Sequence, residues 1–251
     1  MIQKQAVVTG ASEGIGRVFA TALAARGFSV LAVARTQSAL ADLVSTLPGQ
    51  GHAFVVADLG TAAGIALVED RIRKVHVDLL VNNAGVGAVG GFTSQPRATH
   101  HHLLYLNITA LTDLSHAFMQ QAQAGDTLIN VSSVLAFAPQ PVQPIYSATK
   151  AFVTSLSESL WVEGKTRGVH VIGLHPGATD TRFGESSGRP KGARRPGWMM
   201  SSPASVVHTA LRAVKKKKGP NIVPGLLNRL FCQATRWLPR KMTLAAMGRA
   251  S

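Results

Sequence analysis

The chain has 251 residues, of which 46% are hydrophobic, and this composition excludes a disordered protein. Its single cysteine, Cys232, excludes a disulfide framework and a zinc site built from cysteines, and no apolar run reaches the ~18 residues of a membrane-spanning helix. The formal net charge of +14 at pH 7 is typical of proteins that bind nucleic acid, an anionic membrane or an acidic partner, and does not decide among them.

The positive charge is confined to the end of the chain. Residues 1–181 contain 11 Lys or Arg and 11 Asp or Glu, so their net charge is zero. Residues 182–251 contain 15 Lys or Arg and a single acid, Glu185, and therefore carry the whole net charge of +14. The C-terminal part consequently needs an explanation of its own.

Short apolar segments rich in β-formers alternate with longer segments of helical periodicity. Strands are predicted at Gln5–Thr9, Phe28–Ala34, His52–Ala57, Asp78–Val81, Thr127–Val131, Val169–Leu174 and Asn221–Val223. Helices are predicted at Gly14–Arg26, Ser38–Leu47, Ala62–Lys74, Arg97–Gln123, Ile145–Arg167, Pro203–Val214 and Leu226–Leu238. This alternation predicts an α/β fold of the Rossmann type, a doubly wound parallel sheet in a single domain, 1–251, with a helical, basic C-terminal extension.

A glycine-rich turn, Thr9-Gly10-Ala11-Ser12-Glu13-Gly14-Ile15-Gly16, joins the first predicted strand to the first predicted helix. Glycines let the backbone turn tightly beside a pyrophosphate, and the helix N-terminus supplies free N–H groups. The G-x-x-x-G-x-G spacing is a weak signal in a chain with 24 glycines, but its position between strand and helix predicts a nucleotide site. We expect Glu13 to point outward, because its carboxylate would repel a phosphate.

Arg35 follows the second predicted strand, where NAD-selective sites usually carry a carboxylate. Its guanidinium suits a ribose 2′-phosphate, which favours NADP(H). The alternative is a solvent-facing arginine at a strand end. Since Glu13 stands in the adjacent turn, NAD(H) remains open as the cofactor.

Polar and small residues also follow the third and fourth predicted strands. Asp58 is placed to accept a hydrogen bond from an adenine amino group, or else belongs to the N-cap region of the next helix. In Asn82-Asn83-Ala84-Gly85, the small residues would let a ribose lie against the backbone while the asparagines bond neighbouring strands.

Tyr146 and Lys150 lie four residues apart on a predicted helix, so they share one face about 6 Å apart along the axis. A nearby ammonium group favours the phenolate and is expected to lower the tyrosine pKa. The tyrosine can then exchange a proton with a carbonyl or alcohol, and Ser133 can hold the substrate oxygen. A Tyr-x-x-x-Lys spacing by itself is also compatible with a surface pair.

These motifs occur in the order typical of the short-chain dehydrogenases/reductases, which the chain resembles from Gln5 to about Thr181. The resemblance implies that Ser133 orients the substrate, Tyr146 is the acid/base, Lys150 binds the nicotinamide ribose and Asn107 holds a water in the proton relay. It implies a cofactor site made by Gly10, Ser12, Gly14, Ile15, Gly16, Arg35, Asp58, Leu59, Asn83, Ala84, Gly85, Tyr146, Lys150, Pro176, Gly177, Thr179 and Thr181.

Two basic or histidine-rich runs suggest other sites and are discounted. His100-His101-His102 is a poor metal site because consecutive helical side chains point in different directions, and we expect no metal. Lys215–Lys218 is expected to end a helix, where cations complement the helix dipole, rather than to bind nucleic acid.

Residues 182–201 are rich in Gly, Pro, Arg and Ser and end in Trp198-Met199-Met200 before Ser201. A long irregular segment at this place is typical of a functional loop, and we expect a substrate lid. Its basic side chains would attract an anionic group of the substrate, and its Trp and Met side chains would cover an apolar one.

Residues 226–251 form the C-terminal extension. An apolar stripe is predicted along its first helix, formed by Leu226, Leu227, Leu230, Phe231, Ala234, Trp237 and Leu238. We expect this stripe to pack on the protein's own core or on a second subunit, with peripheral contact to an anionic membrane as the alternative.

The sequence therefore predicts a cytoplasmic NADPH-preferring oxidoreductase that interconverts a carbonyl and an alcohol. Its substrate is expected to be a small apolar or acyl molecule, and the protein to be a homodimer or homotetramer without a nucleic-acid partner. Two alternatives stay open: a reductase of 3-oxoacyl thioesters on an acidic carrier, and a non-catalytic NADP-binding interaction protein. No signal peptide is expected, because strand-like sequence begins at Gln5.

Overall fold

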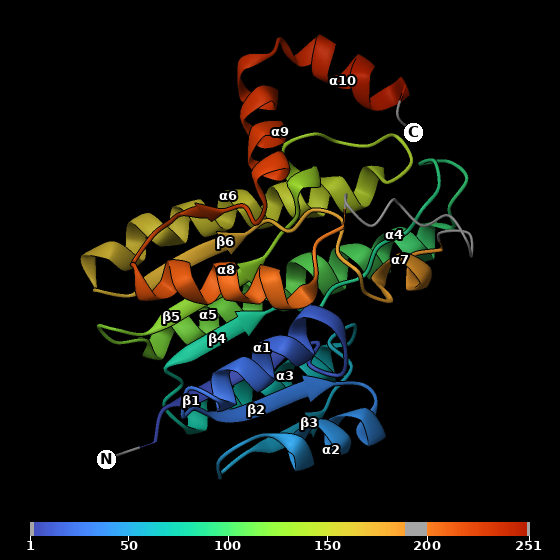
Figure 1. The fold of residues 1–251 in the computed structure, drawn as a ribbon. Helices are drawn as coiled ribbons and strands as arrows, with labels where there is room; N and C mark the ends of the chain where they lie inside the picture. The colour runs from blue at the N-terminus through green and yellow to red at the C-terminus, as the bar shows by residue number, and fades with distance from the viewer. Residues whose placement is uncertain (1–2, 189–199, 250–251) are drawn as a thin grey trace.

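The structure is a computed structural model that describes residues 3–188 and 200–249. Seven parallel strands form one sheet in the order β3-β2-β1-β4-β5-β6-β7 (Figure 1). The strands are β1 (Gln5–Thr9), β2 (Ser29–Ala34), β3 (Ala53–Val56), β4 (Leu79–Asn82), β5 (Thr127–Val131), β6 (His170–Leu174) and β7 (Asn221–Ile222). The predicted α/β fold with a doubly wound parallel sheet is confirmed, and each strand lies within two residues of its predicted bounds.

Helices cover both faces of the sheet (Figure 1). They are α1 (Gly14–Ala24), α2 (Gln37–Thr46), α3 (Ala62–Lys74), α4 (Arg97–Leu104), α5 (Leu111–Gln121), α6 (Pro144–Thr166), α7 (Phe183–Ser186), α8 (Pro203–Lys215), α9 (Leu226–Trp237) and α10 (Arg240–Arg249). A π-helical turn, η1 (Tyr105–Ala110), joins α4 to α5, and a 3-10 turn, η2 (Val134–Ala136), follows β5.

The strands are apolar on both faces because each face is covered. Ala6 and Val8 of β1 belong to a core shared with α1, α2 and α8, whereas Val7 belongs to a second core shared with α3 and α5. Phe19 of α1 and Phe118 of α5 are fully buried in the two cores. Burial of such side chains stabilises the fold by about 1.5–3 kcal/mol each, so the nearly continuous apolar strands reflect a two-sided burial.

The segment 97–123, predicted as one helix, is helical but not uniform. Its middle turn is the π-helix Tyr105–Ala110, which the apolar periodicity does not reveal. Asn107 lies in this turn and both donates to and accepts from the backbone of Val86. Single π-helical turns inside α-helices are frequent at functional sites.

All seven strands run in the same direction, so their carboxyl ends meet at one edge of the sheet. The segments after β1, β4, β5 and β6 therefore come together there, and α9, which follows β7, stands above β6 and α6 in Figure 1. Ligands of such sheets bind outside the carboxyl ends of the strands. Among the described residues, every helix is too short or too polar to cross a bilayer.

Candidate active site

The glycine turn after β1 is held in a conformation that needs glycine. Gly10 and Gly14 have positive φ angles of 65° and 56°. A Cβ atom on Gly16 would overlap the carbonyl oxygen of Gly10, so the start of α1 passes directly against the turn. Such a close approach leaves the backbone N–H groups at the helix N-terminus open to an anion, and Ser12 and Ile15 lie in the same turn.

Asn83 ties the glycine turn to β4. Its side-chain amide donates to the carbonyl oxygens of Thr9 (3.0 Å) and Gly10 (3.2 Å). The hydroxyl of Thr9 in turn accepts from the backbone N–H groups of Asn83 and Ala84, both at 3.0 Å. Asn83 thus shapes the predicted cofactor site through the backbone.

The other asparagine of this motif, Asn82, bonds within the sheet. Its amide donates to the hydroxyl of Ser115 (2.9 Å) and to the side-chain oxygen of Asn130 on β5 (3.0 Å). Both asparagines therefore join neighbouring strands, in agreement with the expectation.

The charged residues around the turn differ in how they are engaged. Arg35 follows β2, is exposed, and has no ion pair among the described residues. Arg17 is paired with Asp42 at 2.7 Å. The side chain of Glu13 is 51% exposed and its nearest cation is Arg182, at 3.9 Å. Glu13 consequently points to solvent, and Arg35 is the cation free to meet a ligand at this strand end.

Asp58 is exposed, and its carboxylate accepts from the backbone N–H of Gly60 at 2.9 Å. The N-cap of α3 is Thr61, whose hydroxyl accepts from the N–H of Gly64 at 3.1 Å. Asp58 therefore closes the turn before the cap, while Leu59 is buried.

Ser133, Tyr146 and Lys150 converge next to the carboxyl end of β5. Ser133 is hydrogen-bonded to the Tyr146 side chain, and the Nζ of Lys150 lies 5.6 Å from the centre of the Tyr146 ring. The ammonium group donates to the carbonyl oxygen of Val131 at 2.9 Å. All three side chains are buried, with exposures of 4–8%. The pair is thus not a surface pair.

Burial raises the pKa of Tyr146 to about 12, and the hydrogen bond from Ser133 only partly opposes this rise. Burial also lowers the pKa of Lys150 to about 8. The expectation that Lys150 lowers the pKa of Tyr146 is therefore wrong for this geometry, because a low-dielectric surrounding disfavours the phenolate more than its neighbours favour it. Tyr146 is protonated at neutral pH.

Asn107 lies beside the cluster of Ser133, Tyr146 and Lys150. Its side-chain amide donates to the hydroxyl of Thr149 at 3.2 Å, one residue from Lys150. A Cβ atom on Gly85 would lie 3.1 Å from the Asn107 side-chain oxygen and 3.5 Å from the Nζ of Lys150. Gly85 thus leaves a narrow space between the two polar side chains.

The segment after β6 borders both halves of the site. The carbonyl oxygen of Pro176 accepts from the N–H of Val134, next to Ser133, at 3.1 Å. Thr179 donates to the carbonyl oxygen of Gly177. A Cβ atom on Gly14 would lie 3.1 Å from the methyl group of Thr181, so Thr181 reaches the glycine turn.

The predicted lid at 182–201 is described in part. Its first residues form α7, in which the Phe183 ring lies 5.6 Å from the Tyr146 ring. A Cβ atom on Gly87 would meet Ser187, so α7 packs on the loop after β4. Residues 189–199, including Trp198 and Met199, lie outside the described residues.

The comparisons with known proteins agree with this arrangement. The profile of the family described as short chain dehydrogenase matches residues 4–191. The chain belongs to the short-chain dehydrogenase family. The resemblance noted in the sequence is therefore confirmed, and the relatives of this family that carry names are oxidoreductases.

Three relatives of this short-chain dehydrogenase are informative. A solved short-chain dehydrogenase from Sphingobium yanoikuyae in complex with NADPH is 31% identical, with a TM-score of 0.83 over 96% of this chain and 95% of that one. The very-long-chain 3-oxoacyl-CoA reductase-A of Danio rerio is 30% identical over 69% of this chain and 57% of its own length. The sulfoacetaldehyde reductase of Chromohalobacter salexigens is 33% identical over 70% of this chain and 72% of its own.

The chain spans less than two thirds of the length of the first curated relatives that it matches, with 57% for the reductase of Danio rerio. Their activities and substrates are therefore statements about those proteins.

The short-chain dehydrogenase motifs do not mark several residues around the site. A Cβ atom on Gly177 would collide with the side chain of Asn228, so α9 packs directly on the segment after β6. The guanidinium of Arg240 donates to the carbonyl oxygen of Phe137 at 3.2 Å. The Phe137 ring packs on His175, 4.9 Å away. These contacts join positions far apart in sequence, and no local pattern indicates them.

The exposure of α9 in the C-terminal extension contradicts part of one expectation. Leu226, Leu227, Leu230 and Trp237 of α9 are 59–82% exposed. The part of the expectation that packs this stripe on the protein's own core is wrong for these side chains, because α9 turns Cys232 inward instead. Packing on a second subunit stays a prediction. The second predicted apolar patch, near Leu244, lies on α10.

The three histidines of α4 do not converge. His100 is stacked on Phe92 and bonded to its carbonyl oxygen at 2.9 Å, whereas His102 lies against Gly60. The lysine run behaves as expected, since α8 ends at Lys215.

Proposed function

We propose that this chain is an NADPH-preferring reductase that converts a carbonyl group to an alcohol, with Tyr146 as the proton donor. The observation that carries the proposal is the buried cluster of Ser133, Tyr146 and Lys150 at the carboxyl edge of the sheet, next to the glycine turn. A protonated tyrosine at neutral pH is suited to give a proton to a carbonyl oxygen.

Each residue of the cluster has a separate proposed role. Ser133 holds the substrate oxygen beside the Tyr146 hydroxyl, and Lys150 stabilises the phenolate that remains after proton transfer. Asn107, bonded to Val86 and Thr149, would hold the water that returns a proton to Tyr146. Phe183 covers Tyr146 and limits the access of water. A bound nicotinamide cofactor would supply the hydride.

The glycine turn fits the pyrophosphate of such a cofactor, because Gly10 and Gly16 pack too closely on Asn83 and on the Gly10 carbonyl to carry a Cβ atom, which keeps the turn tight at the N-terminus of α1. Arg35, exposed and without an ion pair among the described residues, supports a 2′-phosphate at the end of β2. The NADPH complex of the Sphingobium relative supports the same cofactor. NAD(H) remains the second choice, and Asp58 and the Pro176–Thr181 segment complete the proposed cofactor site.

The raised pKa of Tyr146 bears on its role as an acid or a base. Alcohol oxidation needs the phenolate as a base, and a pKa of about 12 leaves little of it near neutral pH. Carbonyl reduction needs the protonated form, which predominates. The raised pKa therefore supports Tyr146 as the proton donor of carbonyl reduction, while substrate and cofactor set the direction of the net reaction.

A 3-oxoacyl thioester is the second candidate substrate. The name of the Danio rerio relative and the excess of cations after residue 181 support it, since an acidic carrier would dock on a basic surface. A KM for carrier-bound substrate that rises steeply with salt would favour this candidate over a free ketone. A purely binding protein has no use for Lys150, whose burial disfavours its charged form.

The proposal is tested by following NADPH oxidation with the full chain across ketones, aldehydes, sulfoacetaldehyde and 3-oxoacyl thioesters. Turnover with at least one class, faster with NADPH than with NADH, is expected. Binding of NADPH without turnover of any class would leave only the non-catalytic alternative. We also propose that the chain folds as a single domain, lies in the cytoplasm and forms a homo-oligomer. Light scattering of the purified chain tests the oligomeric state.

A further inference from the structure

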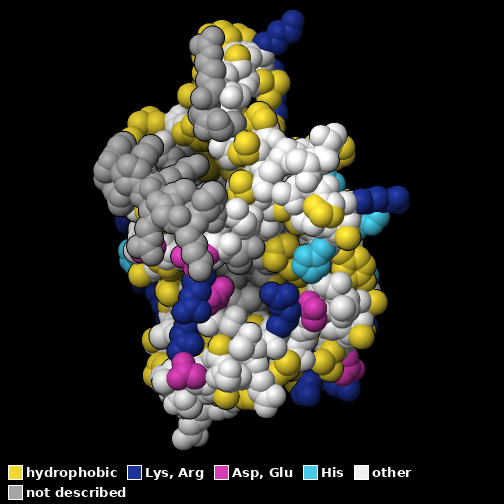
Figure 2. Space-filling model, turned by 90° about the vertical axis from the view of Figure 1, so that its right-hand side faces the viewer, with side chains coloured by type: hydrophobic (Ala, Val, Ile, Leu, Met, Phe, Trp, Pro, Cys, Tyr) yellow, Lys and Arg dark blue, Asp and Glu magenta, His cyan; other side chains and the backbone are white. Residues whose placement is uncertain are grey.

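An apolar face lies exposed on the C-terminal extension. It consists of Leu226, Leu227, Leu230 and Trp237 on α9. Trp237 is 82% exposed and Leu226 is 68% exposed. Met242 and Leu244 on the following helix, α10, are exposed as well. The upper end of the molecule in Figure 2 carries hydrophobic side chains together with Lys or Arg. Contiguous apolar patches of this kind mark interaction sites.

The apolar face occupies one side of α9. At 100° per residue, Leu226, Leu230 and Trp237 fall within one narrow sector, and the buried Cys232 lies on the opposite side. Arg229 and Arg236 are seven residues apart and lie on the flank between the two. The helix therefore presents an apolar sector to solvent, with cations along one border.

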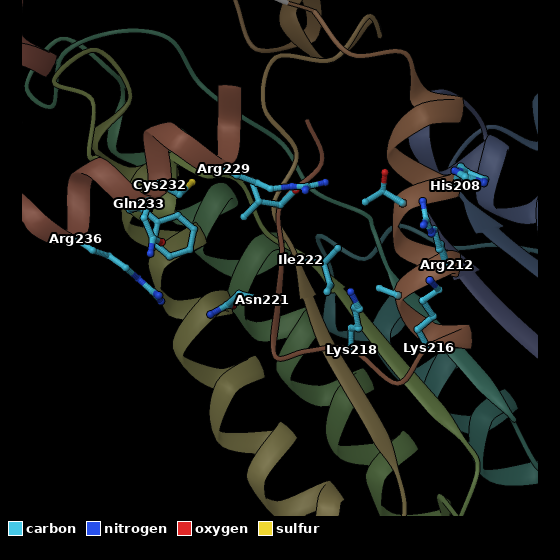
Figure 3. A pocket seen from close by; sticks show the side chains of 14 residues that line it. His208, Arg212, Lys216, Lys218, Asn221, Ile222, Arg229, Cys232, Gln233 and Arg236 are labelled. Carbon is cyan, nitrogen blue, oxygen red and sulfur yellow. The ribbon is translucent and has the colours of Figure 1, made fainter. Parts of the chain in front are cut away.

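Those two arginines also line a basic groove beside the apolar face (Figure 3). The groove has a volume of about 510 Å³ and lies between α8, β7 and α9. Arg212, Lys216 and Lys218 line its other wall. No Asp or Glu lines it, and none of these five cations has an ion pair within the described part of the chain.

The two walls keep their charges available to a ligand. Arg229 uses its Nε to donate to the carbonyl oxygen of Val223 at 2.9 Å, and the Arg236 guanidinium lies 5.8 Å from the centre of the Phe137 ring. Neither contact neutralises the charge. The groove thus combines five uncompensated cations with an adjoining apolar face.

We propose that this surface, the apolar face together with the basic groove, binds an anionic phospholipid bilayer. Trp237 and the leucines of α9 enter the boundary between headgroups and acyl chains, and the groove cations bind lipid phosphates. No Asp or Glu follows Glu185 in the sequence, so the whole extension has the charge that such a surface attracts.

The combination of charge and apolar surface disfavours the other occupants. In a two-fold symmetric contact between copies, each basic groove would face the cations of the other copy, which costs binding energy. Nucleic acid or an acidic carrier protein would use the cations but would leave Leu226, Leu230 and Trp237 exposed to water. Only a bilayer uses both parts of the surface.

Flotation of the full chain with vesicles tests the proposal. We expect binding to vesicles of phosphatidylcholine mixed with phosphatidylserine, and binding roughly tenfold weaker or more to pure phosphatidylcholine. The variant with Leu226→Gln, Leu230→Gln and Trp237→Gln, all exposed positions, should lose binding at least tenfold and keep its activity on a water-soluble carbonyl.

The charge is tested with a matched pair of triple variants. Arg212→Gln, Lys216→Gln and Lys218→Gln remove three cations from the groove. Arg71→Gln, Arg73→Gln and Lys74→Gln remove three from the exposed side of α3. The groove variant should lose most of the binding and the α3 variant should keep it. Equal losses would mean that only net charge matters and would overturn the site.

A spectroscopic measurement needs only one conservative variant. The tryptophan emission of the unmodified chain should shift to shorter wavelength with phosphatidylserine vesicles, and Trp237→Phe should abolish that shift. No binding to phosphatidylserine vesicles would overturn the proposal. So would a change in oligomeric state of the leucine variant without any vesicle binding, which would assign the face to a second copy.

Discussion

Tyr146 and Lys150 show how one environment changes two ionisable groups in opposite directions. Burial disfavours the charged form of each, so the pKa of Tyr146 rises to about 12 and that of Lys150 falls to about 8. Both shifts place the uncharged tyrosine and a lysine that is still mostly charged side by side at neutral pH. This is the protonation state that carbonyl reduction requires.

Replacing Tyr146 by Phe removes the proposed proton donor and keeps the ring that packs on Phe183. We expect the rate of NADPH-dependent reduction to fall by a factor of at least about 10². The affinity for NADPH, measured by fluorescence titration, should change little because Lys150 and the glycine turn are intact. A variant that retains its rate would disprove the role of Tyr146.

The buried Lys150 is expected to lower the stability of the fold. Its pKa of about 8 lies below the usual 10.5, so between these pH values the unfolded chain binds more protons and stability rises with pH. Below about pH 8 the cost is fully present. Lys150→Met should therefore raise the free energy of unfolding at pH 7 by on the order of 1–3 kcal/mol, while reduction is lost.

Urea unfolding at pH 7 and at pH 10 measures this effect. The gain from Lys150→Met should be smaller at the higher pH, because most of the unmodified Lys150 is neutral there in the folded chain. Thr154→Val is the control whose effect should not depend on pH, because the Thr154 hydroxyl donates to the backbone carbonyl of Lys150 and the ammonium group donates to Val131. A less stable Lys150→Met variant at both pH values would contradict the argument.

Arg35 is expected to select the 2′-phosphate. Arg35→Asp places a carboxylate where it repels that phosphate and can accept from a ribose hydroxyl. The ratio of kcat/KM for NADPH to that for NADH should fall at least tenfold, with the fold unaffected since Arg35 is exposed. Arg26→Asp, an exposed arginine after α1, is the matched control. An unchanged ratio would leave Arg35 as a solvent-facing side chain.

At the scale of elements, the site is made by short connections between strands and helices. The glycine turn, η1 and the turn after β5 each hold one part of it, and hydrogen bonds from Asn83 and Asn107 join them across the sheet edge. The π-helical turn matters because it carries Asn107, whose two bonds to Val86 fix the loop after β4. A side chain of one element thus fixes the backbone of a neighbouring element.

Gly16→Ala tests the close passage of α1 against the glycine turn. The added methyl group would overlap the Gly10 carbonyl oxygen, so the turn must shift away from the position that suits a pyrophosphate. We expect at least a tenfold weaker affinity for NADPH, measured by calorimetry, and a lower melting temperature. Gly248→Ala in α10, where a methyl group meets nothing within 4 Å, should change neither.

At the scale of the whole molecule, the charge separates the chain into two regions. Residues 1–181 have no net charge and contain the proposed catalytic group, whereas the last 70 residues carry the net +14. In space the second region supplies α8, which packs beside α1 on one face of the sheet, and α9 and α10, which follow β7 and stand at the top of Figure 1. The cations of α8 and α9 come together only there, in the groove of Figure 3.

Local sequence was sufficient for the parts of this protein that local chemistry determines. The apolar runs predicted all seven strands, because a strand covered on both faces has no room for polar side chains. The glycine turn and the Tyr146–Lys150 pair could also be predicted from the sequence, since steric demands and helical periodicity act over a few residues.

Only the tertiary structure decided what depends on distant contacts. Sequence could not show that burial raises the pKa of Tyr146, because desolvation is contributed by the surrounding fold. It could not show the π-helical turn at Asn107, which is bonded to Val86, 21 positions earlier. Nor could periodicity show that the apolar side of α9 faces solvent. An amphipathic pattern indicates which side of a helix is apolar, but the packing of the whole chain determines what covers that side.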